Sequence, residues 1–251
     1  MKANRFFTTA IFSIIGVLAA AQPWMMRPQG PANEFSAMEG TSVLNYNLQM
    51  ERDIHSRAGY GPAFYIFPDS KLDNNQALEL AGKLDLVNII KEYGGRIMVV
   101  NPSSDKWQEQ DLENFRRLIG MGGSPTNVKV IGIGSGATFV NRHLAATDLT
   151  GVIAGIVSID GEPGKICKLP VPAFIGGKNA AKTAKPYQST SDAAPADPLQ
   201  KVVVNTDKKA SLETLFAEAW DKVLSENYRY NNLYRSFYMS RGIDNPEGVV
   251  Y

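Results

Sequence analysis

Apolar residues along the chain fall in short runs that alternate with longer stretches of helical spacing. The runs 63–67, 128–133 and 152–159 are almost wholly apolar, as expected of strands buried on both faces. Stretches such as 107–119 place apolar residues three and four apart, which predicts amphipathic helices. This alternation predicts an α/β fold, a three-layer sandwich with helices on both faces of a mostly parallel sheet. The predicted strands are 42–50, 63–67, 97–100, 128–133, 152–159, 171–175 and 202–204, and the predicted helices are 72–93, 107–119, 137–146 and 212–224.

The beginning of the chain has the pattern of an export signal. Two basic residues precede an apolar run at 6–21 that ends in three alanines. The run is short for a membrane span, which needs about 20 residues, so we interpret residues 1–21 as a cleaved signal peptide. We therefore expect a secreted or periplasmic protein with no stable membrane insertion after cleavage. Residues 22–41 are expected to form an N-terminal arm, and residues 42–251 a single domain.

The composition narrows the classes of function. The 251 residues include 26 Lys and Arg against 25 Asp and Glu, so a broad basic face for nucleic acid is not expected. One cysteine and two histidines exclude a disulfide framework and a Cys/His zinc cluster, and we expect no metal site. Two irregular segments remain. Residues 178–199 are expected to be a surface loop, and the aromatic and basic residues of 228–241 are expected to pack, or else to meet a carbohydrate or polymer surface.

The stretch with the most chemical content is a glycine-rich turn after the predicted strand 128–133. Gly132, Gly134 and Gly136 alternate with other residues where that strand ends and the next helix begins. Glycines at such a turn let the backbone reverse tightly and let the helix approach the strand without Cβ atoms between them. The simplest interpretation is that they serve strand–helix packing alone.

With this turn in place, the chain resembles the α/β-hydrolase superfamily over about residues 42–225, and most of all its secreted esterases and polyester depolymerases. The resemblance rests on the order of the strands and on a G-x-S-x-G-like turn, which in that family carries a nucleophile on a strained strand-to-helix corner. It implies hydrolysis of carboxylic esters, small or polymeric, by a Ser–His–acid triad without a cofactor.

The residues depart from the family pattern at each triad position. Gly134 stands at the centre of the elbow, so the elbow is degenerate, and Ser135 follows one residue later. If Ser135 is the nucleophile, the N–H of Gly136 helps to hold the oxyanion and Asp160 is the best acid. No histidine follows Asp160, and His143 lies about 12 Å along the helix from Ser135, beyond the reach of a general base.

Several hypotheses therefore stand beside each other. The first is a secreted ester hydrolase that uses Ser135 and Asp160 with an unidentified base. The second is a catalytically inactive binding protein on the same scaffold. The third is a dinucleotide-binding protein, since Gly132–Ala137 also fits G-x-G-x-x-A with Asp160 near the ribose. The strand-like end at 247–251 also allows a longer natural chain that carries the missing histidine.

Overall fold

A computed structural model describes residues 31–48, 62–121, 127–192 and 201–225. Within these ranges the chain forms an eight-stranded sheet in the order β1-β2-β4-β3-β5-β6-β7-β8. The pairs β1–β2 and β2–β4 are antiparallel, and every pair from β4 to β8 is parallel. The strands are β1 Phe35–Ala37, β2 Val43–Tyr46, β3 Ala63–Phe67, β4 Arg96–Val100, β5 Val128–Ile133, β6 Ile153–Ile159, β7 Ala173–Gly176 and β8 Val202–Asn205.

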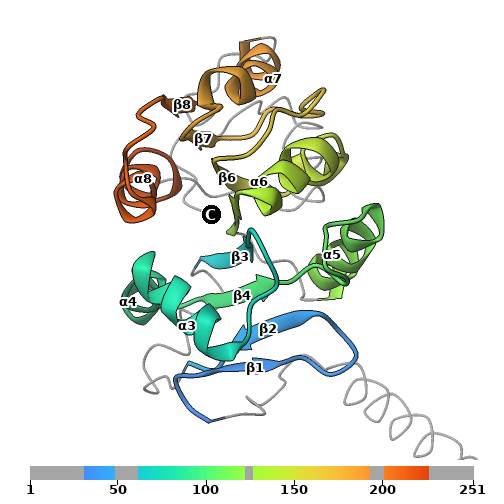
Figure 1. The fold of residues 1–251 in the computed structure, drawn as a ribbon, viewed down its shortest axis with the longest axis vertical. Helices are drawn as coiled ribbons and strands as arrows, with labels where there is room; N and C mark the ends of the chain where they lie inside the picture. The colour runs from blue at the N-terminus through green and yellow to red at the C-terminus, as the bar shows by residue number, and fades with distance from the viewer. Residues whose placement is uncertain (1–30, 49–61, 122–126, 193–200, 226–251) are drawn as a thin grey trace, which may run out of the picture.

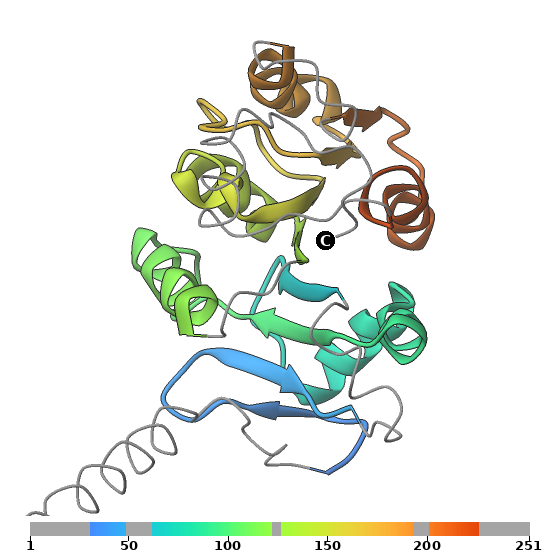
Figure 2. The ribbon, with the colours of Figure 1, turned by 180° about the vertical axis from the view of Figure 1, so that it is seen from behind.

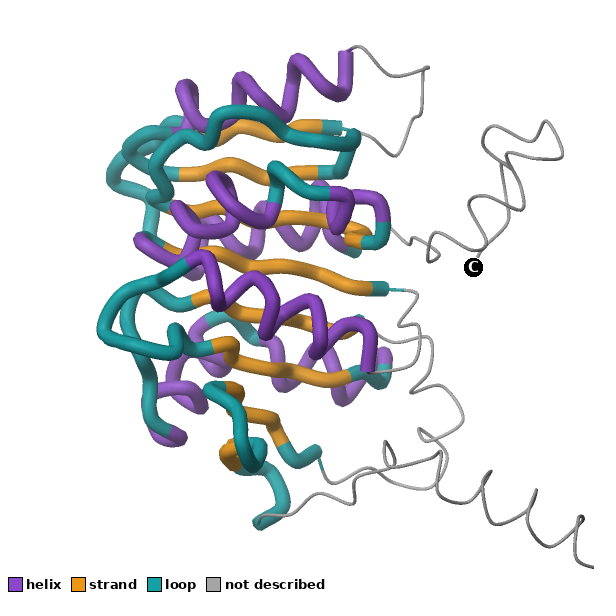
Figure 3. The backbone as a smooth tube through the Cα atoms, turned by 90° about the vertical axis from the view of Figure 1, so that its right-hand side faces the viewer, coloured by secondary structure: helices purple, strands orange, loops and turns teal. Residues whose placement is uncertain are grey.

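Helices cover both faces of this sheet, so the predicted three-layer α/β architecture is confirmed. Figures 1 and 2 show α3, α4 and α8 on one face and α5, α6 and α7 on the other, and Figure 3 shows the strands stacked between them. The helices are α3 Asn74–Lys83, α4 Leu86–Tyr93, α5 Glu109–Met121, α6 Ser135–Phe139, α7 Ala180–Asp192 and α8 Leu212–Ala219, with short turns of other helix types at η1 Val140–Leu144, η2 Asp148–Gly151 and η3 Trp220–Leu224.

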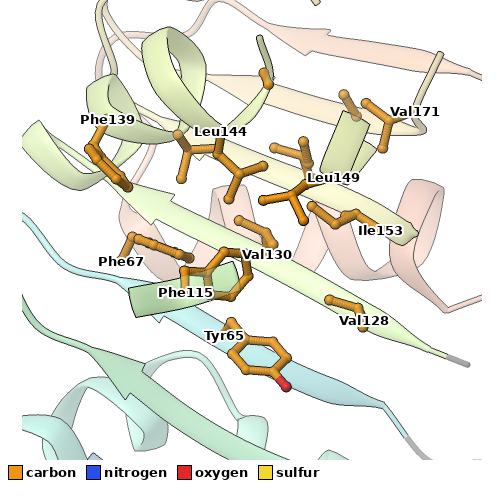
Figure 4. Packing of buried hydrophobic residues seen from close by; sticks show 14 of the residues in the cluster. Tyr65, Phe67, Phe115, Val128, Val130, Phe139, Leu144, Leu149, Ile153 and Val171 are labelled. Carbon is orange, nitrogen blue, oxygen red and sulfur yellow. The ribbon is translucent and has the colours of Figure 1, made fainter. Parts of the chain in front are cut away.

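The sheet separates two hydrophobic cores because successive side chains of a strand point to opposite faces. Along β3, Tyr65 and Phe67 enter the core beneath α5 and α6, whereas Phe64 and Ile66 enter the core beneath α3, α4 and α8. In the first core Phe115 makes edge contacts with both Tyr65 and Phe67, at ring-centroid distances of 5.2 and 5.0 Å. Figure 4 shows this aromatic cluster beside β5.

The predicted helix 72–93 is wrong as a single element, because it is two helices. Asp85 has a left-handed backbone (φ +52°) that ends the first helix and starts the second. The apolar spacing continues across the break, since both Leu84 and Leu86 are buried. Periodicity alone therefore could not reveal the corner.

The loop predicted at 178–199 is also wrong over most of its length, because α7 runs through it. Ala180, Thr183, Ala184 and Tyr187 are buried at helical spacing, and Pro186 sits inside the helix. Proline removes one backbone hydrogen bond but does not stop a helix whose packed face lies elsewhere. A proline among many small residues is typical of a loop, and this composition conceals the helical spacing.

Strand β1 begins inside the segment 22–41 that we interpreted as an arm. Buried Phe35 packs on Tyr46, with ring centroids 5.3 Å apart, and so joins the start of the sheet to β2. Residues 1–21, which we predict to be a signal peptide, lie outside the described residues, as do His55 and the segment 228–241. Among the described residues, no helix is long and apolar enough to cross a membrane.

A lysine is buried near the start of β5, far along the strand from the glycine turn. Lys129 is 1% exposed, and its Nζ donates to the carbonyl oxygen of Leu224 at the end of η3. Burial lowers the pKa of this amine to about 7 from its ordinary 10.5, because removal from water disfavours the charged form. The amine therefore joins β5 to the end of the last described helical segment.

Candidate functional site

The glycine turn lies where the chain's connections leave the sheet in opposite directions. Strands β3 and β5 are neighbours, but β3 leads to α3 on one face and β5 leads to α6 on the other. Ligands of open α/β sheets bind at such a switch point, outside the carboxyl ends of the strands. The loop 68–73 and the turn 132–136 therefore meet at the position where a ligand site is expected.

The backbone of the turn has an elbow geometry, and its strained residue is Gly134. This residue has φ 56° and ψ −118°, a positive-φ conformation that side chains with a Cβ rarely adopt. The flanking glycines permit close packing. A Cβ on Gly132 would lie 2.6 Å from the Cα of Ala137, and one on Gly136 would lie 2.1 Å from the carbonyl oxygen of Phe67.

A sharp, strained turn from the fifth strand into a helix, in a sheet where β2 alone runs against the other strands, decides the fold. It is an α/β-hydrolase-like fold. In an elbow of that kind the nucleophile occupies the strained position, and the N–H of the next residue helps to form the oxyanion hole. Here those positions are Gly134 and Ser135.

Several solved structures are similar to this chain. An α/β hydrolase enzyme from a Medee basin deep-sea metagenome library is 15% identical over 84% of this chain and 95% of that one, with a TM-score of 0.46. A carboxylesterase from Mesorhizobium loti is 9% identical over 75% and 98%, with a TM-score of 0.46. The acylaminoacyl peptidase of Pyrococcus horikoshii is 12% identical over 77% and 41%, with a TM-score of 0.43. No model of a protein family and no curated protein matches the sequence.

The space beside Gly134 is filled by the carboxylate of Asp69, from the loop after β3. A Cβ built on Gly134 would lie 2.2 Å from Asp69 Oδ1, so this oxygen occupies the volume of a side chain at the elbow centre. The same oxygen accepts the backbone N–H of Ser135 at 2.6 Å. The Ser135 hydroxyl donates to the carbonyl oxygen of Asp69. Asp69 therefore fills the space that a side chain at position 134 would occupy, and it also accepts the backbone N–H of Ser135.

Neither Asp69 nor Ser70 caps the helix that follows this loop. The cap of α3 is Asp73, whose Oδ1 accepts the N–H of Gln76 at 2.9 Å while Gln76 Oε1 accepts the N–H of Asp73 at 3.0 Å. This reciprocal pair is a capping box, and its Asp-x-x-Gln spacing was readable in the sequence. Because Asp73 caps the helix, Asp69 is free to reach the elbow.

The predicted acid, Asp160, lies at the end of the neighbouring strand β6. The Gly134 N–H donates to the carbonyl oxygen of Ile159 at 2.9 Å, so the turn and Asp160 are at the same edge of the sheet. The carboxylate of Asp160 faces the turn after β7, where its Oδ1 accepts the N–H of Lys178 at 2.9 Å. Among the described residues, no hydrogen bond joins Ser135 to Asp160.

A buried polar network fixes the loop that follows Asp160. Asn141 donates to Ser158 Oγ at 3.0 Å and to the carbonyl oxygen of Glu162 at 2.9 Å. The hydroxyl of Tyr187 donates to Asn141 Oδ1 at 2.9 Å, and burial raises the pKa of this hydroxyl well above its usual value. The network joins β6, η1 and α7 to one another and to the loop that follows Asp160.

His143 belongs to an aromatic stack rather than to the elbow. Its ring stacks on Phe139 with centroids 5.3 Å apart, and Phe139 stacks in turn on Trp107 at 4.7 Å. The indole N–H of Trp107 donates to the carbonyl oxygen of Pro68, which holds the stack against the loop after β3. Among the described residues Ser135 has no hydrogen bond to a histidine, and no group of three or more His, Cys, Asp and Glu side chains that could hold a metal ion is present.

Proposed function

We propose that this protein is an exported, non-catalytic relative of α/β hydrolases that binds its ligand without hydrolysing it. The observation that carries the proposal is the occupied elbow. Gly134 supplies no nucleophile, and the Asp69 carboxylate lies within 2.6 Å of the amide that would hold an oxyanion. A carboxylate at that amide opposes the negative charge that develops on an ester carbonyl during attack. The export pattern at residues 1–21 supports a role outside the cytoplasm.

A second candidate is ester hydrolysis by Ser135. This serine is exposed beside the elbow, as a nucleophile must be. Against it, the hydroxyl donates to a backbone carbonyl instead of a base, and a backbone carbonyl cannot accept its proton for catalysis. The catalytic assignment of Ser135, Asp160 and the Gly136 N–H stays a prediction that the following experiment decides.

The test is labelling with a fluorophosphonate, which reacts with activated serines, read as intact mass. We expect no adduct on the wild-type protein and no turnover on a panel of carboxylic esters. Ser135→Ala is the diagnostic variant, and Ser70→Ala, an exposed serine in the adjoining loop, is its matched control. A known serine esterase in the same reaction shows that the probe is active.

One result would overturn the proposal. A single adduct that disappears in Ser135→Ala and persists in Ser70→Ala would establish an activated serine, and the ester-hydrolase candidate would replace the binding protein. Loss of ester turnover in the same variant would give the same answer from an independent readout.

A further inference from the structure

An isoleucine protrudes from the loop between β6 and β7. Ile166 is 65% exposed, and among the described residues Leu78, at 36%, is the other exposed large hydrophobic side chain. Exposed lysines stand on either side of Ile166, at Lys165 and Lys168. An apolar tip between cations is a combination that interfacial segments of membrane-binding proteins share.

The exposure of Ile166 is enforced by the way its loop is fastened. Its neighbour Cys167 is 3% exposed, and the carbonyl oxygen of that residue accepts a hydrogen bond from Thr190 Oγ1 at 2.9 Å. The N–H of Lys168 donates to the carbonyl oxygen of Ala145 at 2.8 Å. With the next two residues held against the protein, Ile166 is directed outward.

The surroundings of Ile166 are predominantly basic. Helix α7 lies along the loop, because Thr183 Oγ1 donates to the carbonyl oxygen of Gly161 at 3.0 Å. Arg142 Nε donates to the carbonyl oxygen of Pro163 at 3.5 Å from the other side. Across η1, residues 161–170 and α7 the acidic residues are Glu162 and Asp192, although the whole chain carries a formal charge of only +1. We define the basic face as Ile166 together with Arg142, Lys165 and Lys168.

These cations are directed to solvent rather than to carboxylates of the protein. None of the ion pairs formed between described residues includes a member of the basic face. Their charge is therefore available to an anionic partner. A purely polar polyanion would gain nothing from Ile166, whereas a bilayer offers anionic headgroups to the lysines and an apolar interior to the isoleucine.

We propose that the basic face docks the protein on the surface of an anionic lipid bilayer. Ile166 enters the headgroup boundary, and the lysines and Arg142 contact the anionic headgroups around it. None of these residues belongs to the elbow, so the proposal goes beyond the proposed function. It rests on that function only for export, which would bring the protein to such a surface. Fluorophosphonate labelling and bilayer binding can succeed or fail separately.

The test is co-sedimentation of the full chain with vesicles of phosphatidylcholine, with and without about a third phosphatidylglycerol. The measured quantity is the ratio of binding to anionic and neutral vesicles. Each variant is compared with the wild type, because the apolar N-terminal run and the two basic residues before it are common to both. We expect Lys165→Glu/Lys168→Glu to lower this ratio at least about tenfold. The control Lys208→Glu/Lys209→Glu, which reverses two exposed lysines in the loop after β8, should change it less than about twofold.

A second pair of variants separates a bilayer from other partners. Ile166→Ser should weaken binding to anionic vesicles, whereas Leu78→Ser, on the opposite face of the sheet, should not. An unchanged ratio in both lysine variants, or an equal loss in the two, would overturn the proposal. So would an Ile166→Ser protein that binds anionic vesicles and a soluble sulfated polymer as well as the wild type does, because the partner would then be a polyanion.

Discussion

The two ends of strand β5 place charged groups in opposite environments. At its carboxyl end the exposed carboxylate of Asp69 accepts a backbone N–H of the elbow. At its amino end the amine of Lys129 is 1% exposed and donates to a helix-terminal carbonyl oxygen. Both groups join β5 to a distant part of the chain, but only the lysine does so out of contact with water.

The two groups therefore differ in what they affect: Asp69 fixes local backbone structure, whereas the burial of Lys129 changes the free energy of unfolding. The Asp69 carboxylate stays in contact with water, so its hydrogen bond to the elbow requires little desolvation free energy. The Lys129 ammonium loses its hydration in the folded state, and its pKa falls to about 7 in consequence. We therefore expect changes at the amino end of β5 to alter stability and its pH dependence, and changes at the carboxyl end to alter local structure.

The largest expected effect is the pH dependence that Lys129 imposes. Between pH 7 and 10.5 the unfolded chain holds a proton on this amine that the folded chain has released, so the free energy of unfolding rises with pH. The full difference between the two pKa values corresponds to about 5 kcal/mol. Denaturant unfolding of wild type and Lys129→Met across this range measures it. Lys91→Met, which changes an exposed lysine, is the control.

Only the difference between the two pH profiles is diagnostic, because other groups titrate in the same range. We expect the Lys129→Met profile to rise less steeply than those of wild type and Lys91→Met. Parallel profiles for all three proteins would mean that the amine keeps its ordinary pKa in the folded state.

The next largest effect is expected from a side chain at the elbow centre. Gly134→Ala combines a positive φ with a Cβ 2.2 Å from Asp69 Oδ1, and it should lower the free energy of unfolding by about 2 to 3 kcal/mol. The control Gly82→Ala places a Cβ in open space on α3 and should be neutral or stabilising. Urea midpoints compare the two.

The two causes can be separated with a double variant. Asp69→Gly/Gly134→Ala removes the carboxylate that the new Cβ meets but keeps the backbone strain, so it should recover part of the loss. If Gly134→Ala unfolded at the wild-type midpoint, the described contact between Asp69 and the elbow would be wrong.

The smallest effect is expected from removal of the exposed carboxylate. Asp69→Ala deletes the acceptor of the Ser135 N–H and should lower the free energy of unfolding by about 1 kcal/mol. Amide hydrogen exchange is the sharper readout, since the Ser135 N–H should exchange faster. Asp105→Ala, an exposed carboxylate after β4, should leave that rate unchanged, and equal rates in both variants would contradict the contact.

The buried strands were the part of the fold that sequence patterns predicted best. The runs at 63–67 and 128–133 coincide with β3 and β5, because a strand buried on both faces needs an unbroken apolar run. The helices were predicted less well. The corner at Asp85 interrupts no apolar spacing, and the proline within α7 outweighed the spacing of the residues that pack there.

The candidate site was likewise predictable from the sequence only in part. The glycine turn was evident locally, since its residues are adjacent in the chain. The partner of the turn was not, because Asp69 and Ser135 are 66 residues apart and their contact exists only once β3 and β5 pair. The residues around Asp69 in the sequence therefore do not indicate that its carboxylate accepts the N–H of Ser135.

The Trp107 stack makes the loop after β3 observable. Its indole is held by the carbonyl oxygen of Pro68, the residue before Asp69, and lies against Phe139 two turns or less from the elbow. Indole emission depends on such contacts, so movement of Asp69 away from the turn should change the fluorescence of Trp107. In a variant with Trp24→Phe and Trp220→Phe, Trp107 is therefore an intrinsic optical probe for the opening of the elbow, and displacement of the carboxylate by a ligand would be detected without a label.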